Sequence, residues 1–119
     1  MAEAKMYRGS CHCGNVSYEV QTDLGTVLSC NCSICSRAGY LLAFVPAQQF
    51  KLVSGQEAQR DYQFNKKKIH HLFCTTCGVR SFGHGTGPDG SEMYAINVRT
   101  LDGVDLEALK IQKVNGKDL

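Results

Sequence analysis

The sequence predicts a small, mainly β domain whose chain is stapled by metal ions, and three observations lead to this fold class. Short stretches alternate apolar and polar residues and end at glycine or proline, as half-buried strands do. The seven cysteines fall into three groups at one- and two-residue spacing, which is typical of metal ligands. A chain of 119 residues buries a modest core, so metal ions would add much to its stability.

The first predicted strands surround the first cysteine group. Met1–Met6 is expected to be a frayed start, and Tyr7–Ser10 leads into Cys11-His12-Cys13. Val16–Val20 alternates apolar and polar residues, so we predict a half-buried strand that leaves this group. Thr26–Ser29 is predicted to be a second strand, which delivers the central cysteine group.

The middle of the chain carries the segment that is expected to run through the core. Tyr40–Val45 is apolar on both faces and is stopped by Pro46, which predicts a buried strand. Phe50–Gly55 follows as a strand that ends at glycine, and Gln59–Phe64 alternates around its two aromatic residues. Residues 65–68, Asn-Lys-Lys-Lys, are expected to be a solvated turn and not a phosphate-binding patch.

The glycine-rich segment Gly85–Gly90 matches the letters G-x-G-x-x-G. Dinucleotide binding requires that motif to close a strand and open a helix. Here Pro88-Asp89-Gly90 is typical of a turn, and the predicted strands Val79–His84 and Met93–Val98 lie on either side. We therefore predict a hairpin loop.

The remaining elements are short. Ile69–Phe73 is a predicted strand that feeds the last cysteine group at Cys74, and Val104–Leu109 carries leucines at helical spacing. No linker or internal repeat divides the chain, so we predict a single domain over residues 1–119.

Composition and charge exclude several classes of protein. The net charge of +2 is too near zero to indicate a nucleic-acid or membrane-surface binder. The first residues contain no apolar signal core, and the longest apolar run, Tyr40–Val45, is too short to span a bilayer. We therefore expect a cytoplasmic protein. In that reducing compartment structural disulfides are disfavoured. With an odd number of cysteines, one thiol would also have no disulfide partner.

The central group, Cys30, Cys32 and Cys35, places three thiols within six residues. A tight loop that runs into a short helical turn can aim three such sulfurs at one point about 2.3 Å away, as a tetrahedral zinc site requires. If a distant residue supplies the fourth ligand, the site is structural. If water or substrate takes that position, the site is chemical.

A count of thiolate ligands suggests that the two outer cysteine groups share one metal site. Cys11 and Cys13 supply two thiolates, and Cys74 and Cys77 supply two more, with Gly78 letting the backbone turn under the metal. Together they would make a closed four-thiolate site, which is structural by default and whose binding energy would be folding energy.

The central group is then left without an eighth cysteine, and a histidine could close it. The candidates are His12, His70, His71 and His84. His84, in the predicted loop, is the best of them. Spacing alone does not decide between an open and a closed central site, and other groupings of the seven cysteines stay open.

Four motifs stand out by their order and spacing: Gly9–Tyr18, Cys30–Cys35, Phe73–Gly78 with Arg80 and Phe82, and Ile96–Asp102. Together they cover most of the chain, and they resemble the glutathione-dependent formaldehyde-activating enzymes, whose broader group includes the centromere protein V type. The resemblance implies a β-tent fold of folded-over antiparallel sheets with little helix. It also implies two zinc ions, a structural one on Cys11, Cys13, Cys74 and Cys77 and a catalytic one on Cys30, Cys32 and Cys35.

The reaction that the resemblance implies is the addition of glutathione to formaldehyde, which gives S-hydroxymethylglutathione and is classed as a carbon–sulfur lyase in the cleaving direction. The expected partners are therefore a small thiol and a small aldehyde. Two departures bear on the substrate. Asn31 stands where family members usually carry histidine, and residues 110–119 lack the aromatic-rich end of many members.

The chemistry of a three-thiolate zinc site agrees with this reaction. Such a site has a formal charge of −1, so it is a weak Lewis acid but binds a fourth sulfur well. A substrate thiol with a free pKa near ~8.5 would be held as the thiolate at neutral pH. Arg37 and Arg80 are expected to offset the anionic charge, with substrate binding as their second role. Tyr40, Tyr62 and Tyr94 are expected to be core or sheet residues, so we predict no general base.

The competing hypothesis is a non-catalytic two-zinc scaffold that binds a protein or nucleic-acid partner, because a fold does not fix a function. The chain has no basic stripe beyond residues 66–68, which argues against the nucleic-acid version. An exchangeable, thiol-accessible central zinc would favour the enzyme.

Overall fold

The computed structural model describes residues 4–63, 69–87 and 89–115, and it confirms a mainly β fold. A three-stranded sheet has the order β1-β2-β5 and a seven-stranded sheet the order β10-β3-β4-β9-β8-β7-β6. In chain order the strands are β1 (Lys5–Ser10), β2 (Ser17–Thr22), β3 (Val27–Cys30), β4 (Leu42–Pro46), β5 (Phe50–Ser54), β6 (Gln59–Tyr62), β7 (His70–Cys74), β8 (Phe82–Thr86), β9 (Glu92–Asn97) and β10 (Ile111–Val114).

Helix is sparse in the described part of the chain. The single α-helix there, α1 (Ser33–Ala38), follows β3, and the other helical elements are 3₁₀ turns of three residues each. These turns are η1 (Ala47–Gln49), η2 (Gln56–Ala58), η3 (Val98–Thr100) and η4 (Leu106–Ala108). No described helix has the length and apolar character needed to cross a membrane.

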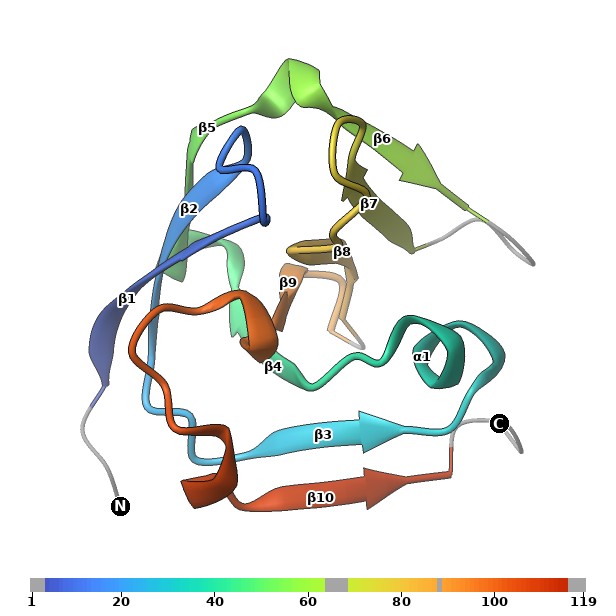
Figure 1. The fold of residues 1–119 in the computed structure, drawn as a ribbon. Coiled ribbons are helices and arrows are strands. Elements are labelled where there is room, and N and C mark those ends of the chain that lie inside the picture. Colours follow the sequence, from blue (N-terminus) through green and yellow to red (C-terminus); the bar gives the residue numbers. More distant parts are fainter. Residues whose placement is uncertain (1–3, 64–68, 88, 116–119) are drawn as a thin grey trace.

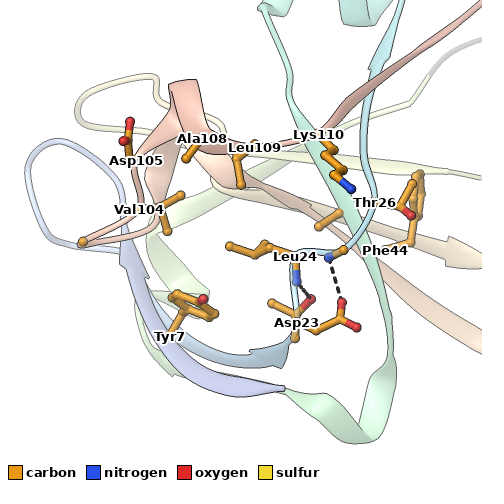
Figure 2. Close-up of a pocket in the computed structure, with 14 residues that line it drawn as sticks. Tyr7, Asp23, Leu24, Thr26, Phe44, Val104, Asp105, Ala108, Leu109 and Lys110 are labelled. Atoms are coloured by element: carbon orange, nitrogen blue, oxygen red, sulfur yellow. Dashed lines mark hydrogen bonds between the residues drawn. The ribbon is translucent and has the colours of Figure 1, made fainter. Parts of the chain in front are cut away.

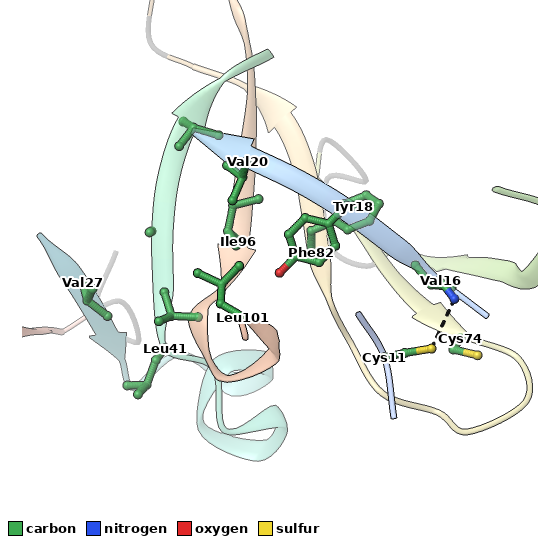
Figure 3. Close-up of a cluster of buried hydrophobic side chains, with 13 residues drawn as sticks. Cys11, Val16, Tyr18, Val20, Val27, Leu41, Cys74, Phe82, Ile96 and Leu101 are labelled. Atoms are coloured by element: carbon green, nitrogen blue, oxygen red, sulfur yellow. Dashed lines mark hydrogen bonds between the residues drawn. The ribbon is translucent and has the colours of Figure 1, made fainter. Parts of the chain in front are cut away.

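The core lies between the two sheets, where their apolar residues meet (Figure 3). Tyr18 and Val20 alternate with less buried neighbours along β2, as predicted, and both are almost completely buried. They pack with Phe82 and Ile96 from the larger sheet. The alternation that predicted half-buried strands therefore arises because each sheet covers one face of the other.

The two faces of the seven-stranded sheet have different neighbours. The register of the paired strands shows which side chains lie on each face. Side chains that pair across strands point to the same face, and successive residues alternate between faces. Ile96 pairs with Phe82, and both are buried in the core, so we call their face the inner face. Leu28 pairs with Leu42 on the opposite, outer face. Cys30, two residues after Leu28, lies on the outer face as well.

The structure corrects the expected N-terminal and C-terminal ends. The expected frayed start extended to Met6, but β1 begins at Lys5 and pairs with β2 over its whole length; residues 1–3 lie outside the described part. β10 was not predicted at all and runs parallel to β3, whereas the other strand pairs are antiparallel. The helical spacing in Val104–Leu109 produces only η4.

Two mid-chain expectations change as well. The predicted strand Tyr40–Val45 begins at Leu42, and Phe44 is 50% exposed, so β4 is covered on one face and not on both. The predicted loop Gly85–Gly90 begins too early, because Gly85 and Thr86 belong to β8, but β8 pairs antiparallel with β9, which confirms the hairpin. Phe64, the lysine-rich turn at 65–68 and Pro88 lie outside the described residues.

Candidate metal centres

The turn after β1 and the turn after β7 meet across the fold and bring four cysteines together (Figure 1). The sulfurs of Cys11, Cys13, Cys74 and Cys77 all lie within 4.8 Å of one another. Cys13 Sγ is 3.6 Å from the sulfurs of both Cys11 and Cys74. A tetrahedral zinc with bonds of ~2.3 Å has sulfur–sulfur edges of about 3.8 Å, so the four sulfurs are spaced to hold such an ion.

Both turns are shaped by the same local devices. Gly14 and Gly78 have φ of 85° and 79°, in the left-handed region that glycine adopts without strain, so the predicted turn at Gly78 is present. The N–H of Val16 donates to Cys11 Sγ at 3.3 Å, and the N–H of Thr76 donates to Cys74 Sγ at 3.4 Å. These donors stabilise thiolate sulfur.

Proton affinities within this group are unequal. The N–H of Cys13, and then that of Val79, lower the pKa of Cys77 to about 6. The N–H of Asn15 lowers the pKa of Cys13, but desolvation and the neighbouring sulfurs outweigh it and raise this pKa to about 12. Four adjacent thiolates repel one another unless a cation offsets their charge. The donor set therefore fits a divalent, thiophilic metal.

The second group forms where β3 enters α1. Cys30 ends β3, Cys32 is the N-cap residue of α1, and Cys35 lies in the helix. Their sulfurs lie within 4.8 Å of one another, and no fourth histidine, cysteine or carboxylate among the described residues joins them. The N–H of Cys35 donates to Cys32 Sγ and the N–H of Cys32 donates to Cys30 Sγ, both at 3.5 Å. The predicted loop and helical turn are thus present.

Burial and proton affinity distinguish the sulfurs of this second group. Cys35 is buried, whereas Cys30 and Cys32 are partly exposed. Burial, and then the adjacent sulfur of Cys32, raise the pKa of Cys35. Desolvation also acts to raise the pKa of Cys32, but the N–H of Cys35 and other nearby donors outweigh it and lower this pKa. The group therefore reaches the protein surface through the partly exposed residues Cys30 and Cys32.

Tyr40 lies near Cys35 of the second group, and Arg80 lies near Tyr40, because both affect the pKa of the Tyr40 hydroxyl. Sequence reasoning had singled out both Tyr40 and Arg80. Burial raises the pKa of Tyr40, Arg80 acts against this, and the charge of Cys35 reinforces it. Arg80 also lies over the Phe73 ring, 5.2 Å from its centroid. Its Nη1 is buried and has no hydrogen-bond partner among the described residues, so it is a cationic donor without an acceptor.

Other predicted residues have structural roles. Arg37 is exposed and donates to the Ser33 carbonyl at 3.0 Å within α1. Asn31 donates to Asn115 Oδ1 at 2.8 Å, which links the end of β3 to the end of β10. Arg99, which lies in the motif Ile96–Asp102 but was given no role of its own, donates from Nε to the Gly39 carbonyl at 3.1 Å and so holds the C-terminal cap of α1. Only the fold brings Arg99 near α1, so the sequence did not predict this contact.

The histidines do not join the second group. His84, the best sequence candidate, lies on the inner face, where its Nδ1 is 3.2 Å from Glu92 Oε1. Its ring stacks on His70 with centroids 4.4 Å apart, and His70 Nδ1 is 2.5 Å from Asp61 Oδ2. His12 is exposed between two cysteines of the first group. Among the described residues the second group therefore offers three candidate ligands.

A cavity of about 770 Å³ lies away from both cysteine groups, between the loop after β2 and residues 103–110 (Figure 2). No cysteine or histidine lines it. Two of its polar side chains are bonded to their own loop. Asp23 Oδ1 accepts from the Gly25 N–H at 2.8 Å, and Thr22 Oγ1 accepts from the Leu24 N–H at 3.2 Å. Nothing in this cavity competes with the cysteine groups as a chemical centre.

Comparisons with known proteins agree with this arrangement. A family model described as "Glutathione-dependent formaldehyde-activating enzyme" matches residues 6–113. The crystal structure of a Rhodobacter sphaeroides protein is similar to this fold, with a TM-score of 0.80 and 32% sequence identity. The match covers 90% of this chain and 99% of that one.

Proposed function

Because the chain belongs to the glutathione-dependent formaldehyde-activating enzyme family, we propose that it is a zinc-dependent carbon–sulfur lyase. It would form or cleave a thiol–aldehyde adduct such as S-hydroxymethylglutathione. One observation carries the proposal: the sulfurs of Cys30, Cys32 and Cys35 converge without a fourth protein ligand among the described residues. A site with three protein ligands keeps a position for substrate, as catalytic zinc sites do.

The two cysteine groups would then have different roles, one structural and one catalytic. Cys11, Cys13, Cys74 and Cys77 would hold a structural ion, because four thiolates complete a tetrahedron. Cys30, Cys32 and Cys35 would hold the catalytic ion. When bound there, zinc supplies a fourth position at which a substrate thiol is held as the thiolate.

The residues of the chain would bind and orient the substrates around that position. Arg80 adds a cation near Tyr40, and its Nη1, which is buried without a partner among the described residues, would donate to a substrate carboxylate once a side-chain movement uncovers it. Tyr40, whose pKa is raised by burial, stays protonated at neutral pH and can donate to the aldehyde oxygen. In the forward direction the thiolate sulfur adds to the carbonyl carbon, and the C=O π electrons move to oxygen, which takes a proton from solvent. Cleavage reverses these steps.

We also propose a single domain over residues 1–119 that works in the cytoplasm on a small thiol and a small aldehyde. The family match over residues 6–113 supports the domain, the thiol and the aldehyde. The three-cysteine group supports the thiol independently, because thiolate is a ligand that zinc favours.

Metal stoichiometry under mild chelation, with and without excess glutathione, tests the proposal. We expect two zinc ions per chain, one for each cysteine group, with one readily removed and protected by the thiol. In cobalt-substituted protein, glutathione should change the sulfur-to-cobalt charge-transfer absorption of the same site. Two inert ions, unaffected by glutathione, would overturn the proposal and favour the scaffold.

Matched substitutions separate the two groups. Cys32→Ser should leave a folded protein with one zinc and no adduct formation from glutathione and formaldehyde. Cys74→Ser should lose folded protein, because it breaks a closed site that joins segments 61 residues apart. Equal unfolding by both changes would contradict the division into catalytic and structural ions.

A further inference from the structure

The first turn of α1 carries two of the cysteines of the three-cysteine group. Cys32 is the N-cap residue and Cys35 follows three positions later, so their side chains occupy neighbouring positions on the helix. The N–H of Cys35 donates to Cys32 Sγ at 3.5 Å, and the sulfurs of the group lie within 4.8 Å of one another. Thiol–disulfide oxidoreductases use this same Cys-x-x-Cys spacing. The two sulfurs can therefore form a disulfide with little movement of the backbone.

The two residues differ in their access to solvent. Cys32 is partly exposed, whereas Cys35 is buried, so an oxidant in solution has access to Cys32 first. A sulfenic acid on a cysteine condenses with an adjacent thiol to a disulfide, and without such a thiol it can be oxidised further and irreversibly. Cys35 is the adjacent thiol. The pair therefore has the arrangement of an attacked cysteine and a resolving cysteine.

Cys30 is less well placed to resolve an oxidised Cys32, although it is also partly exposed. It ends β3 and pairs with Val114 of β10, and the N–H of Asn31 donates to the Val114 carbonyl at 3.1 Å. The backbone between Cys30 and Cys32 is thus held by β10. A disulfide between these two residues would bend that segment, whereas one between Cys32 and Cys35 stays within a single helical turn.

The four-cysteine group provides an internal comparison, because Cys74 and Cys77 have the same Cys-x-x-Cys spacing. One disulfide would leave that group with two thiolates for a metal ion. The three-cysteine group would keep only Cys30. Loss of the metal ion after a single disulfide is therefore expected of the three-cysteine group, since one thiolate is far short of a tetrahedral ligand set.

We propose that Cys32 is a site of oxidation by hydroperoxides, and that Cys32 and Cys35 form a reversible disulfide that releases the metal ion of the three-cysteine group. The Cys32 thiolate attacks a peroxide oxygen, the O–O bond breaks, and hydroxide or alkoxide leaves. The Cys35 thiolate then attacks Cys32 Sγ of the sulfenic acid, so that the S–S bond forms, the S–O bond breaks and hydroxide leaves. Two thiolates give up two electrons, the peroxide gains them, and two protons from solvent neutralise the leaving groups.

A small thiol such as glutathione would reverse the oxidation. Its thiolate attacks Cys32 Sγ and Cys35 leaves as the thiolate; a second glutathione then frees Cys32 and becomes glutathione disulfide. As regulation of the catalytic site, this inference rests on the proposed function, because the disulfide would switch the lyase off and the thiol substrate would restore it. The disulfide itself can be tested without any assay of activity.

The test treats the zinc-loaded full chain with hydrogen peroxide and removes the excess with catalase. Native mass spectrometry then counts the zinc ions on each chain, and fragmentation of alkylated proteolytic peptides locates the disulfide. We expect a disulfide between Cys32 and Cys35, the loss of one zinc ion for each disulfide formed, and recovery of both thiols and zinc after glutathione and zinc are added. Cys11, Cys13, Cys74 and Cys77 should stay reduced in chains that have lost one ion.

Two substitutions within the group are matched. Cys30→Ser should still form the disulfide between Cys32 and Cys35. Cys35→Ser should instead leave Cys32 as a sulfenic acid that dimedone captures, or as a mixed disulfide when glutathione is present. If either variant fails to fold, the location of the disulfide in the wild-type chain decides the question.

A first disulfide between Cys30 and Cys32, or one in the four-cysteine group, would overturn the proposal. So would a disulfide at Cys32 and Cys35 with both zinc ions retained, or no oxidation at peroxide concentrations that fully oxidise free cysteine. A chain that forms the disulfide but makes no adduct from glutathione and formaldehyde would refute the proposed lyase and leave the oxidation site standing. An active chain without the disulfide would refute the oxidation site alone.

Discussion

Asn97 connects the core to the segment that presents Arg80. It is 7% exposed, and its Nδ2 donates to the Arg80 carbonyl at 2.8 Å. Its Oδ1 accepts from the Arg99 N–H at 3.3 Å. The Thr100 hydroxyl donates to the Asn97 carbonyl at 2.8 Å, and the Tyr18 hydroxyl lies 2.6 Å from Thr100 Oγ1. A chain of hydrogen bonds thus runs from β2 to Arg80, and its removal should affect stability and the site together.

The magnitude for Asn97→Ala follows from the two side-chain bonds that it deletes. Losing the N-cap bond to Arg99 costs about 1 kcal/mol. Leaving the Arg80 carbonyl without its donor costs about 2 kcal/mol. The free energy of unfolding should therefore fall by about 3 kcal/mol, which corresponds to roughly 10 °C in the melting temperature of a chain of this size.

Asn97→Asp isolates the bond to Arg80, because an aspartate still accepts from the Arg99 N–H and caps equally well. Near neutral pH the introduced carboxylate faces the Arg80 carbonyl without a proton to donate. Burial and this carbonyl both favour the protonated acid, so its folded pKa lies above the unfolded value of ~3.9. The loss of stability is then complete above the folded pKa and shrinks as the pH falls through it toward the unfolded pKa.

Urea unfolding of zinc-loaded protein measures these changes, with equal denaturant slopes as the check on two-state behaviour. The deficit of Asn97→Asp relative to wild type should narrow as the pH falls through the folded pKa of the introduced carboxyl group, whereas that of Asn97→Ala should not. Gln48→Glu at an exposed position controls for added charge. An Asn97→Ala cost under ~1 kcal/mol, or parallel pH profiles for the two variants, would refute the account of this bond.

Three further predictions follow from single contacts. A Cβ at Gly9 would lie 2.3 Å from Tyr18 Cζ, so Gly9→Ala should cost about 1–3 kcal/mol in urea unfolding, and Tyr18→Leu in the same chain should recover part of it. Burial lowers the pKa of His84, with the charge of His70 acting in the same direction. The folded state therefore resists protonation of His84, and the free energy of unfolding falls as the pH drops below ~6.5. His84→Gln should reduce this fall when the free energy of unfolding is measured against pH. Arg80→Met should weaken glutathione binding to the zinc-loaded protein, measured calorimetrically, about tenfold or more, with Arg80→Lys intermediate because it keeps the charge without the planar fork.

Local patterns were enough to predict the parts of the fold that depend on neighbouring residues. The alternation of Val16–Val20 predicted β2, and the cysteine spacing predicted groups whose sulfurs do converge. The strand at Ile111–Val114 was missed because its partner, β3, begins at Val27, and such pairing leaves no local signal. Phe44 was predicted to be buried on composition alone. Its exposure depends on which elements cover β4, which the sequence does not reveal.

The candidate site shows the same limit. The clustered cysteines are close in sequence, so their spacing identified them as candidate ligands. The placement of His84 could not be read in that way, because it depends on whether β8 turns that residue to the inner or the outer face. Likewise, Arg80 could be named only by its position near Cys77. Its contact with Tyr40 and the bond between its carbonyl and Asn97 come from segments distant in the chain.

The position of Arg80 also indicates why one chain would carry two metal groups. Arg80 follows Cys77 by three residues, and Asn97 fixes its carbonyl. The four-cysteine group therefore anchors one end of the short segment that places the guanidinium near Tyr40, on whose pKa Cys35 of the three-cysteine group also acts. A metal ion in the first group would restrict the segment that serves the second, because bound metal stabilises the folded arrangement of its ligands. Loss of the ion proposed for the four-cysteine group should then weaken thiol binding at the three-cysteine group before the β core unfolds.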